Sequence, residues 1–171
     1  DLTAAGRANK VGKNYLIQHS AGSGKSLTIA WLAYRLAELH TLDDKKVYDT
    51  VIVLTDRRVL DKQLRNTIKA LEARAGILVS AGEDNTRLKD ALESGAKIIT
   101  TTIQKFPFVE NLVAKLSDKK FALIVDEAHS SQSGELRRTV QETLGDYDVE
   151  DWLLRQLSSR RQPNNISYFA F

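Results

Sequence analysis

Short apolar runs alternate with longer helical patterns along this 171-residue chain, and this alternation constrains the possible folds more than any other feature. The apolar runs are rich in β-branched residues and span residues 15–17, 51–54, 97–101, 121–125 and 166–171, with a weaker run at 77–79. Runs of this kind are typical of strands that are covered on both faces, as in parallel sheets. Apolar positions at helical spacing lie between them, at residues 26–39, 59–73, 86–94 and 109–116. The sequence therefore predicts an α/β fold with a central parallel sheet and helices on both faces.

The composition indicates one soluble globular domain covering residues 1–171, with 42% hydrophobic and 27% charged residues. The complete lack of methionine predicts that this domain is an internal fragment of a longer chain. No apolar run approaches the roughly 20 residues that span a bilayer, and without cysteine the chain cannot form disulfides or thiolate metal sites. We therefore expect a cytoplasmic location and no membrane partner. A net charge of +3 is too small to indicate nucleic-acid binding by itself.

The segment His-Ser-Ala-Gly-Ser-Gly-Lys-Ser at residues 19–26 lies between a predicted strand and a predicted helix, which is the context of a phosphate-binding loop. Small residues let the backbone surround a phosphate next to the positive end of a helix dipole. Lys25 is predicted to contact the β- and γ-phosphates of ATP, and the Ser26 hydroxyl to bind Mg²⁺. His19 replaces the first glycine of the full pattern, so a glycine-rich strand–helix turn is the alternative. The backbone of the loop is predicted to hold the nucleotide at Ala21, Gly22, Ser23, Gly24, Lys25 and Ser26.

Two adjacent carboxylates follow the apolar strand at residues 121–125. A carboxylate at the carboxyl end of a strand, beside a phosphate loop, can hold the Mg²⁺ of a bound nucleotide, and we assign this role to Asp126. Glu127 is then available to orient or deprotonate the attacking water. An Asp-Glu pair alone is also a common loop start. Together with the loop at 19–26, it predicts an ATP site with Lys25, Asp126 and Glu127 as catalytic residues.

The D-E-A-H sequence at residues 126–129 and the loop at 19–26 together resemble the first motor domain of superfamily 2 helicases and translocases. More narrowly, the chain is similar to the motor segment of type I restriction enzyme R subunits. The segments that carry this resemblance are residues 17–26, 53–64, 100–106 and 126–135. The resemblance implies a RecA-like P-loop NTPase domain that uses ATP and Mg²⁺.

The same resemblance implies a track for DNA. The candidate contacts are Thr55, Arg57, Arg58, Thr101, Thr102, Gln104 and Lys105. Hydroxyl and guanidinium groups at strand ends are suitable phosphate ligands, although β-propensity is an alternative reason for the threonines and a solvated helix face for the arginines. A role in coupling hydrolysis to movement is implied for His129 and Gln132. The alternative for His129 is a partly buried polar residue that hydrogen-bonds to a neighbour.

By resemblance, the complete subunit is an ATP-dependent type I site-specific deoxyribonuclease. It translocates double-stranded DNA and works with modification and specificity subunits. Its nuclease domain precedes this segment, and a second RecA-like domain follows and completes the ATP site, so we expect the isolated chain to show almost no turnover. The alternatives are another superfamily 2 DNA or RNA helicase and a P-loop nucleotide-binding module without motor action.

Overall fold

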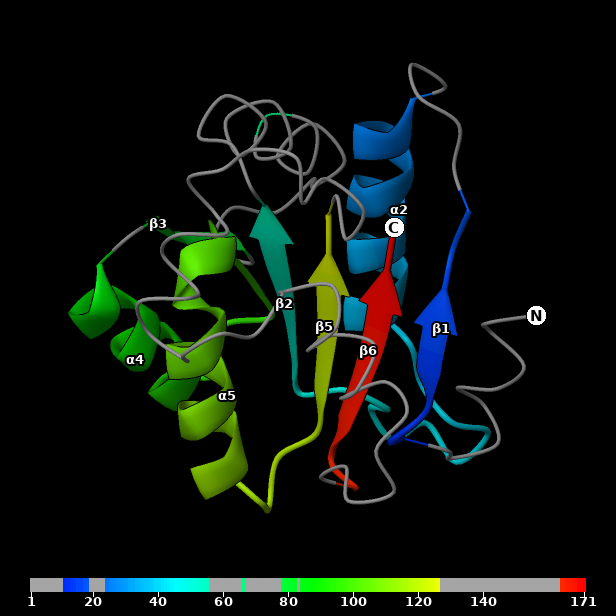
Figure 1. The fold of residues 1–171 in the computed structure, drawn as a ribbon. Coiled ribbons are helices and arrows are strands. Elements are labelled where there is room, and N and C mark those ends of the chain that lie inside the picture. Colours follow the sequence, from blue (N-terminus) through cyan, green and yellow to red (C-terminus); the bar gives the residue numbers. More distant parts are fainter. Residues whose placement is uncertain (1–10, 19–23, 56–65, 67–77, 83, 127–163) are drawn as a thin grey trace.

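A six-stranded sheet forms the centre of the computed structural model (Figure 1). The structure describes residues 11–18, 24–55, 66, 78–82, 84–126 and 164–171. The strands are β1 (Asn14–Leu16), β2 (Thr50–Thr55), β3 (Leu78–Gly82), β4 (Ile98–Thr102), β5 (Phe121–Val125) and β6 (Ile166–Ala170). They lie in the order β1-β6-β5-β2-β4-β3, and each neighbouring pair is parallel. The predicted parallel sheet is therefore confirmed, and the predicted runs differ from the strands by only a few residues at their ends.

The described helices cover both faces of this sheet. They are α2 (Lys25–Ala37), α4 (Asn85–Glu93) and α5 (Phe106–Lys115), which follows the short 3₁₀ turn η1 (Ile103–Lys105). Figure 1 shows α2 behind the sheet, and α4 and α5 in front of it. The helix predicted at 59–73 lies outside the described residues. None of the helices that the structure describes is both long and apolar enough to cross a membrane.

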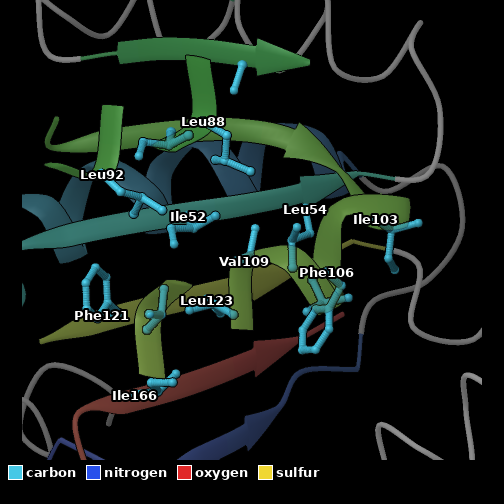
Figure 2. Close-up of a cluster of buried hydrophobic side chains, with 14 of the residues drawn as sticks. Ile52, Leu54, Leu88, Leu92, Ile103, Phe106, Val109, Phe121, Leu123 and Ile166 are labelled. Carbon is cyan, nitrogen blue, oxygen red and sulfur yellow. The ribbon is translucent and has the colours of Figure 1, made fainter. Parts of the chain in front are cut away.

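Alternation along the central strands divides the core into two layers. Ile52, Leu54 and Leu123 are buried against α4 and α5, as Figure 2 shows with Leu88, Leu92 and Val109 from these helices. Residues one position away on the same strands face α2, where Val51, Val53, Ala122 and Ile124 pack with Ile29 and Ala33. Successive side chains of a strand point to opposite faces. The continuous apolar runs therefore follow from a sheet that has a hydrophobic layer on each side.

Candidate nucleotide-binding site

The carboxyl ends of all six strands lie along one edge of the sheet, because the strands are parallel. Helix α2 begins with Lys25, and in Figure 1 its N-terminal end points in the direction of the arrowheads and lies beyond their tips. Asp126 directly follows β5 at the same edge. In open α/β sheets, ligands bind outside the carboxyl ends of the strands. The topology therefore brings the end of the predicted phosphate loop and the predicted metal-binding carboxylate to the place where this fold binds ligands.

An ion pair joins these two residues. The Nζ atom of Lys25 lies 3.1 Å from Oδ1 of Asp126, and the side chains are 27% and 4% exposed. The carboxylate is thus almost fully removed from water, whereas the ammonium group retains some contact with solvent. The expectation that Lys25 and Asp126 lie side by side is confirmed. Their roles toward a nucleotide remain predictions.

The start of α2 has the geometry of an anion site. Gly24 precedes the helix with φ +86°, a left-handed conformation that favours glycine. Its carbonyl accepts hydrogen bonds from the amides of Leu27 and Thr28, at 3.0 and 3.1 Å, which closes the first turn. No acidic side chain lies in this first turn. The 13-residue helix therefore directs the positive end of its dipole to the carboxyl edge beside Lys25.

A single row of side chains crosses the sheet at this edge. The amide of Asp126 donates to the Leu54 carbonyl at 2.9 Å, which places Asp126 opposite Thr55 in the parallel pair β5–β2. Thr55 is opposite Thr102 of β4. On the other side, the amide of Phe171 donates to the Val125 carbonyl at 3.0 Å, which places Phe171 opposite Asp126. These four residues point to the α2 face, because they continue the alternation of the α2-facing core residues.

The residues at this site fit Mg²⁺ bound together with a nucleotide. Mg²⁺ prefers oxygen ligands and usually takes one or two from the protein, completing its shell with phosphates and water. Asp126 supplies a buried carboxylate, and the half-buried Ser26 supplies a hydroxyl on the second residue of α2. Among the residues that the structure describes, no group of three His, Asp or Glu side chains could form a separate metal centre. Asp126 and Ser26 would leave most of the Mg²⁺ shell to phosphate oxygens and water.

Several predicted site residues lie outside the described part of the chain. They are Ala21, Gly22 and Ser23 of the loop, Glu127, His129 and Gln132 after β5, and Arg57 and Arg58 after β2. The structure neither supports nor opposes their assignments, which remain predictions.

The predicted DNA contacts that are described fall into two groups. Thr55, Thr101 and Thr102 are buried, with at most 3% of their surface exposed, and the Thr101 hydroxyl donates to the Gly82 carbonyl at 2.6 Å. These three side chains are therefore closed to DNA in this structure, which corrects the expectation that all the threonines offer hydroxyls to the backbone. Gln104 is exposed and Lys105 half-buried in η1, so both remain candidates. The threonines at residues 100–102 belong to β4, which is buried at every position. Their burial favours β-propensity as the reason for these residues.

A second pair of polar groups lies on the opposite face of the sheet. Burial raises the pKa of Glu110 on α5, and burial together with the nearby Glu110 raises the pKa of Tyr168 on β6. Tyr168 belongs to the core layer that faces α5. Because Asp126 points to the α2 face, this pair is separate from the ion-pair site.

Comparison with known proteins identifies the family. Residues 3–149 match the family model of the SWI2/SNF2 ATPases. The chain belongs to the SWI2/SNF2 ATPase family. The parallel sheet with helices on both faces agrees with the RecA-like fold predicted from the sequence.

Curated relatives narrow this assignment. The C-terminal part of a type I restriction enzyme endonuclease subunit from Mycoplasma pneumoniae is 34% identical over 76% of this chain and 63% of its own length. An endonuclease subunit from Staphylococcus saprophyticus is 31% identical over 96% of this chain but 15% of its own length. The HindI endonuclease subunit of Haemophilus influenzae is 31% identical over 68% of this chain and 11% of its own length. The resemblance to R subunits of type I restriction enzymes is therefore confirmed, and the chain spans only part of each relative.

Proposed function

We propose that this chain is the ATP-binding half of the motor in a type I restriction endonuclease subunit, where ATP hydrolysis drives translocation along double-stranded DNA. The observation that carries the proposal is the Lys25–Asp126 ion pair, 3.1 Å long, at the carboxyl edge of the sheet. Membership of the SWI2/SNF2 ATPase family and the names of the relatives support it.

In this function, Lys25 contacts the β- and γ-phosphates of ATP as a point charge, next to the positive end of the α2 dipole. Backbone amides of residues 21–26 surround the phosphates. Asp126 and the Ser26 hydroxyl hold Mg²⁺, which neutralises phosphate charge when it is bound. Lys25 and Asp126 contact each other in the structure. In this function Lys25 contacts phosphate and Asp126 contacts Mg²⁺ instead, so nucleotide binding separates the ion pair.

The remaining assignments extend beyond the described residues. Glu127 orients or deprotonates the attacking water, and His129 and Gln132 couple hydrolysis to movement. Arg57, Arg58, Gln104 and Lys105 contact the DNA backbone, where their effect is independent of sequence and sensitive to salt. A second RecA-like domain completes the ATP site. The partners are the modification and specificity subunits of a restriction complex.

Simple measurements can distinguish the proposed function from its alternatives. Another superfamily 2 motor would share the ATP site but differ in the nucleic acid that stimulates it. A P-loop module without motor action would bind ATP with no response to nucleic acid. Stimulation of turnover by linear duplex DNA, and not by RNA, distinguishes the proposed function from an RNA helicase and from a module without motor action.

The test uses the full-length protein with Lys25→Ala and, as a matched control, Lys45→Ala, which removes an exposed lysine in the segment that follows α2. Calorimetry measures ATP affinity and a steady-state assay measures turnover. We expect Lys25→Ala to weaken ATP binding and remove DNA-stimulated hydrolysis, and Lys45→Ala to match the wild type. ATP binding that is equal in the wild type and in Lys25→Ala would exclude the proposed site.

A further inference from the structure

Thr55 lies next to Asp126 in the row of side chains at the carboxyl edge, on the side away from Phe171. Thr102 follows directly on the next strand, because Thr55 and Thr102 are register partners in β2 and β4. Neighbouring strands are about 5 Å apart, and opposite residues point to the same face. The carboxylate and the two hydroxyls therefore stand side by side, in the order Asp126, Thr55, Thr102.

Both hydroxyls are buried at positions where packing alone does not require them. Thr55 and Thr102 are 0% and 3% exposed, and neither Oγ1 atom has a hydrogen-bond partner among the described residues. A buried polar atom without a partner destabilises a protein. Valine has nearly the same shape and is equally suited to strands. A hydroxyl at each position thus calls for a hydrogen-bond partner, and the described residues supply none.

We infer that Thr55 is a positioning residue for the Asp126 carboxylate, and that Thr102 supports Thr55 through a hydrogen bond. This inference rests on the proposed ATP-binding function. When phosphate takes Lys25 away from Asp126, the carboxylate loses the cation that now lies 3.1 Å from Oδ1. The Thr55 hydroxyl then donates to this carboxylate from the neighbouring strand.

The direction of the hydrogen bonds follows from the chemistry of the groups. An ionised carboxylate only accepts, whereas a hydroxyl donates one hydrogen bond and accepts others. In the order Thr102 to Thr55 to Asp126, each hydroxyl donates once and the carboxylate accepts. Partners of this kind fix the orientation of a carboxylate that binds a metal and raise its affinity for the ion. Thr55 therefore contributes to Mg²⁺ affinity without touching the metal or the nucleotide.

The experiment measures ATP binding to the full-length protein by calorimetry, in EDTA and over a series of Mg²⁺ concentrations. For Thr55→Val we expect a rise of about tenfold in the Mg²⁺ concentration that gives half of the Mg²⁺-dependent change in ATP affinity. Removing a hydrogen-bond partner of a metal ligand typically weakens metal binding by about 10–100-fold. ATP affinity in EDTA should stay at the wild-type value. Thr55→Ser keeps the hydroxyl and should restore the wild-type Mg²⁺ dependence, whereas Thr55→Ala should behave as Thr55→Val. Thr102→Val should cause a smaller shift in the same direction.

Thr50→Val is the matched control. Thr50 is also a buried threonine of β2 whose hydroxyl has no partner among the described residues, but it lies at the other end of the strand. Its replacement should leave the Mg²⁺ dependence unchanged.

The inference is overturned if Thr55→Val and Thr55→Ala keep the wild-type Mg²⁺ dependence, or if Thr55→Ser shifts it as far as they do. Equal losses of ATP affinity with and without Mg²⁺ would show a merely structural role and would also overturn it. Failure of the proposed function looks different, because Lys25→Ala would then bind ATP as well as the wild type, whatever the threonine variants do.

Discussion

Replacing Asp126 with asparagine is expected to strengthen the binding of metal-free ATP and to remove the dependence of binding on Mg²⁺. In the structure, Oδ1 of Asp126 lies 3.1 Å from the ammonium group of Lys25. The contact between Lys25 and this carboxylate must therefore break before Lys25 can contact the phosphates of ATP. Asparagine has nearly the same shape but no charge, so it holds Lys25 less strongly and also removes the repulsion between the carboxylate and the phosphates. The same change removes the carboxylate proposed to hold the metal.

The distance gives the size of the expected effect. Two unit charges 3.1 Å apart attract by about 1.3 kcal/mol in bulk water and about 5 kcal/mol at the effective dielectric constant of about 20 that suits protein sites. Lys25 is 27% exposed, so solvent screens part of this attraction, and asparagine can still accept a hydrogen bond from it. A net contribution of about 1–2 kcal/mol remains, which corresponds to roughly 5–30-fold tighter binding of ATP in EDTA.

Calorimetric titration of the full-length protein with ATP, in EDTA at low ionic strength, measures this gain. Asp118→Asn is the control, because it removes an exposed carboxylate elsewhere on the surface and changes the net charge by the same amount. It should bind metal-free ATP as the wild type does. If Asp126→Asn binds metal-free ATP more weakly than the wild type, then Lys25 is not the group that ATP recruits, and the reasoning from the ion pair is wrong.

Three further variants test the chemistry and the fold. Glu127→Gln should keep ATP binding and lower turnover by about 10²–10⁴-fold, as expected for loss of an acid–base group; unchanged steady-state ATPase activity would contradict this role. Burial raises the pKa of Glu110 above the ordinary value of 4.5, so ionising it favours the unfolded state and the stability of the wild type should fall as pH rises above that value. Glu110→Gln should remove this contribution to the pH dependence of stability, measured by urea unfolding from about pH 4 to about pH 8. Leu123→Ala, at a fully buried position of β5, should lower the free energy of unfolding by about 2–5 kcal/mol, whereas Leu42→Ala, at an 89% exposed position, should leave it unchanged.

The strands and the core could be predicted from the sequence because their signal is local. The run at residues 121–125 is apolar at every position, and the structure buries all of it as β5. The carboxylate that ends this run was placed at the carboxyl edge by the same argument, and its contact with Lys25 follows from a helix that begins at that edge. Local patterns combined with the rules for parallel sheets were sufficient for this part of the site.

The position of each residue across the sheet could not be predicted, because it depends on strand order. The resemblance implies DNA contacts for Thr55 and Thr102, and their positions at strand ends agree with that role. Whether such a side chain faces solvent, α2 or α5 is decided by the register with neighbouring strands and by what covers that face. The burial of Tyr48 could not be predicted for the same reason. Tyr48 lies in a polar segment before β2, but its side chain packs edge-on against Phe169 of β6 and is only 4% exposed.

Strand order also explains why the two sides of Asp126 differ. β5 lies between β6 and β2, so Asp126 has Phe171 as its register neighbour on one side and Thr55 on the other. An aromatic ring gives a carboxylate no hydrogen-bond donor, whereas a hydroxyl does. Of these two register neighbours, Thr55 on β2 is the one whose side chain carries a hydrogen-bond donor. A sheet with the same loop and the same D-E-A-H sequence, but with β2 and β6 exchanged, would place Thr55 on the other side of Asp126. The neighbours of the proposed metal ligand are thus set by the strand order, and they cannot be read from any single motif of the sequence.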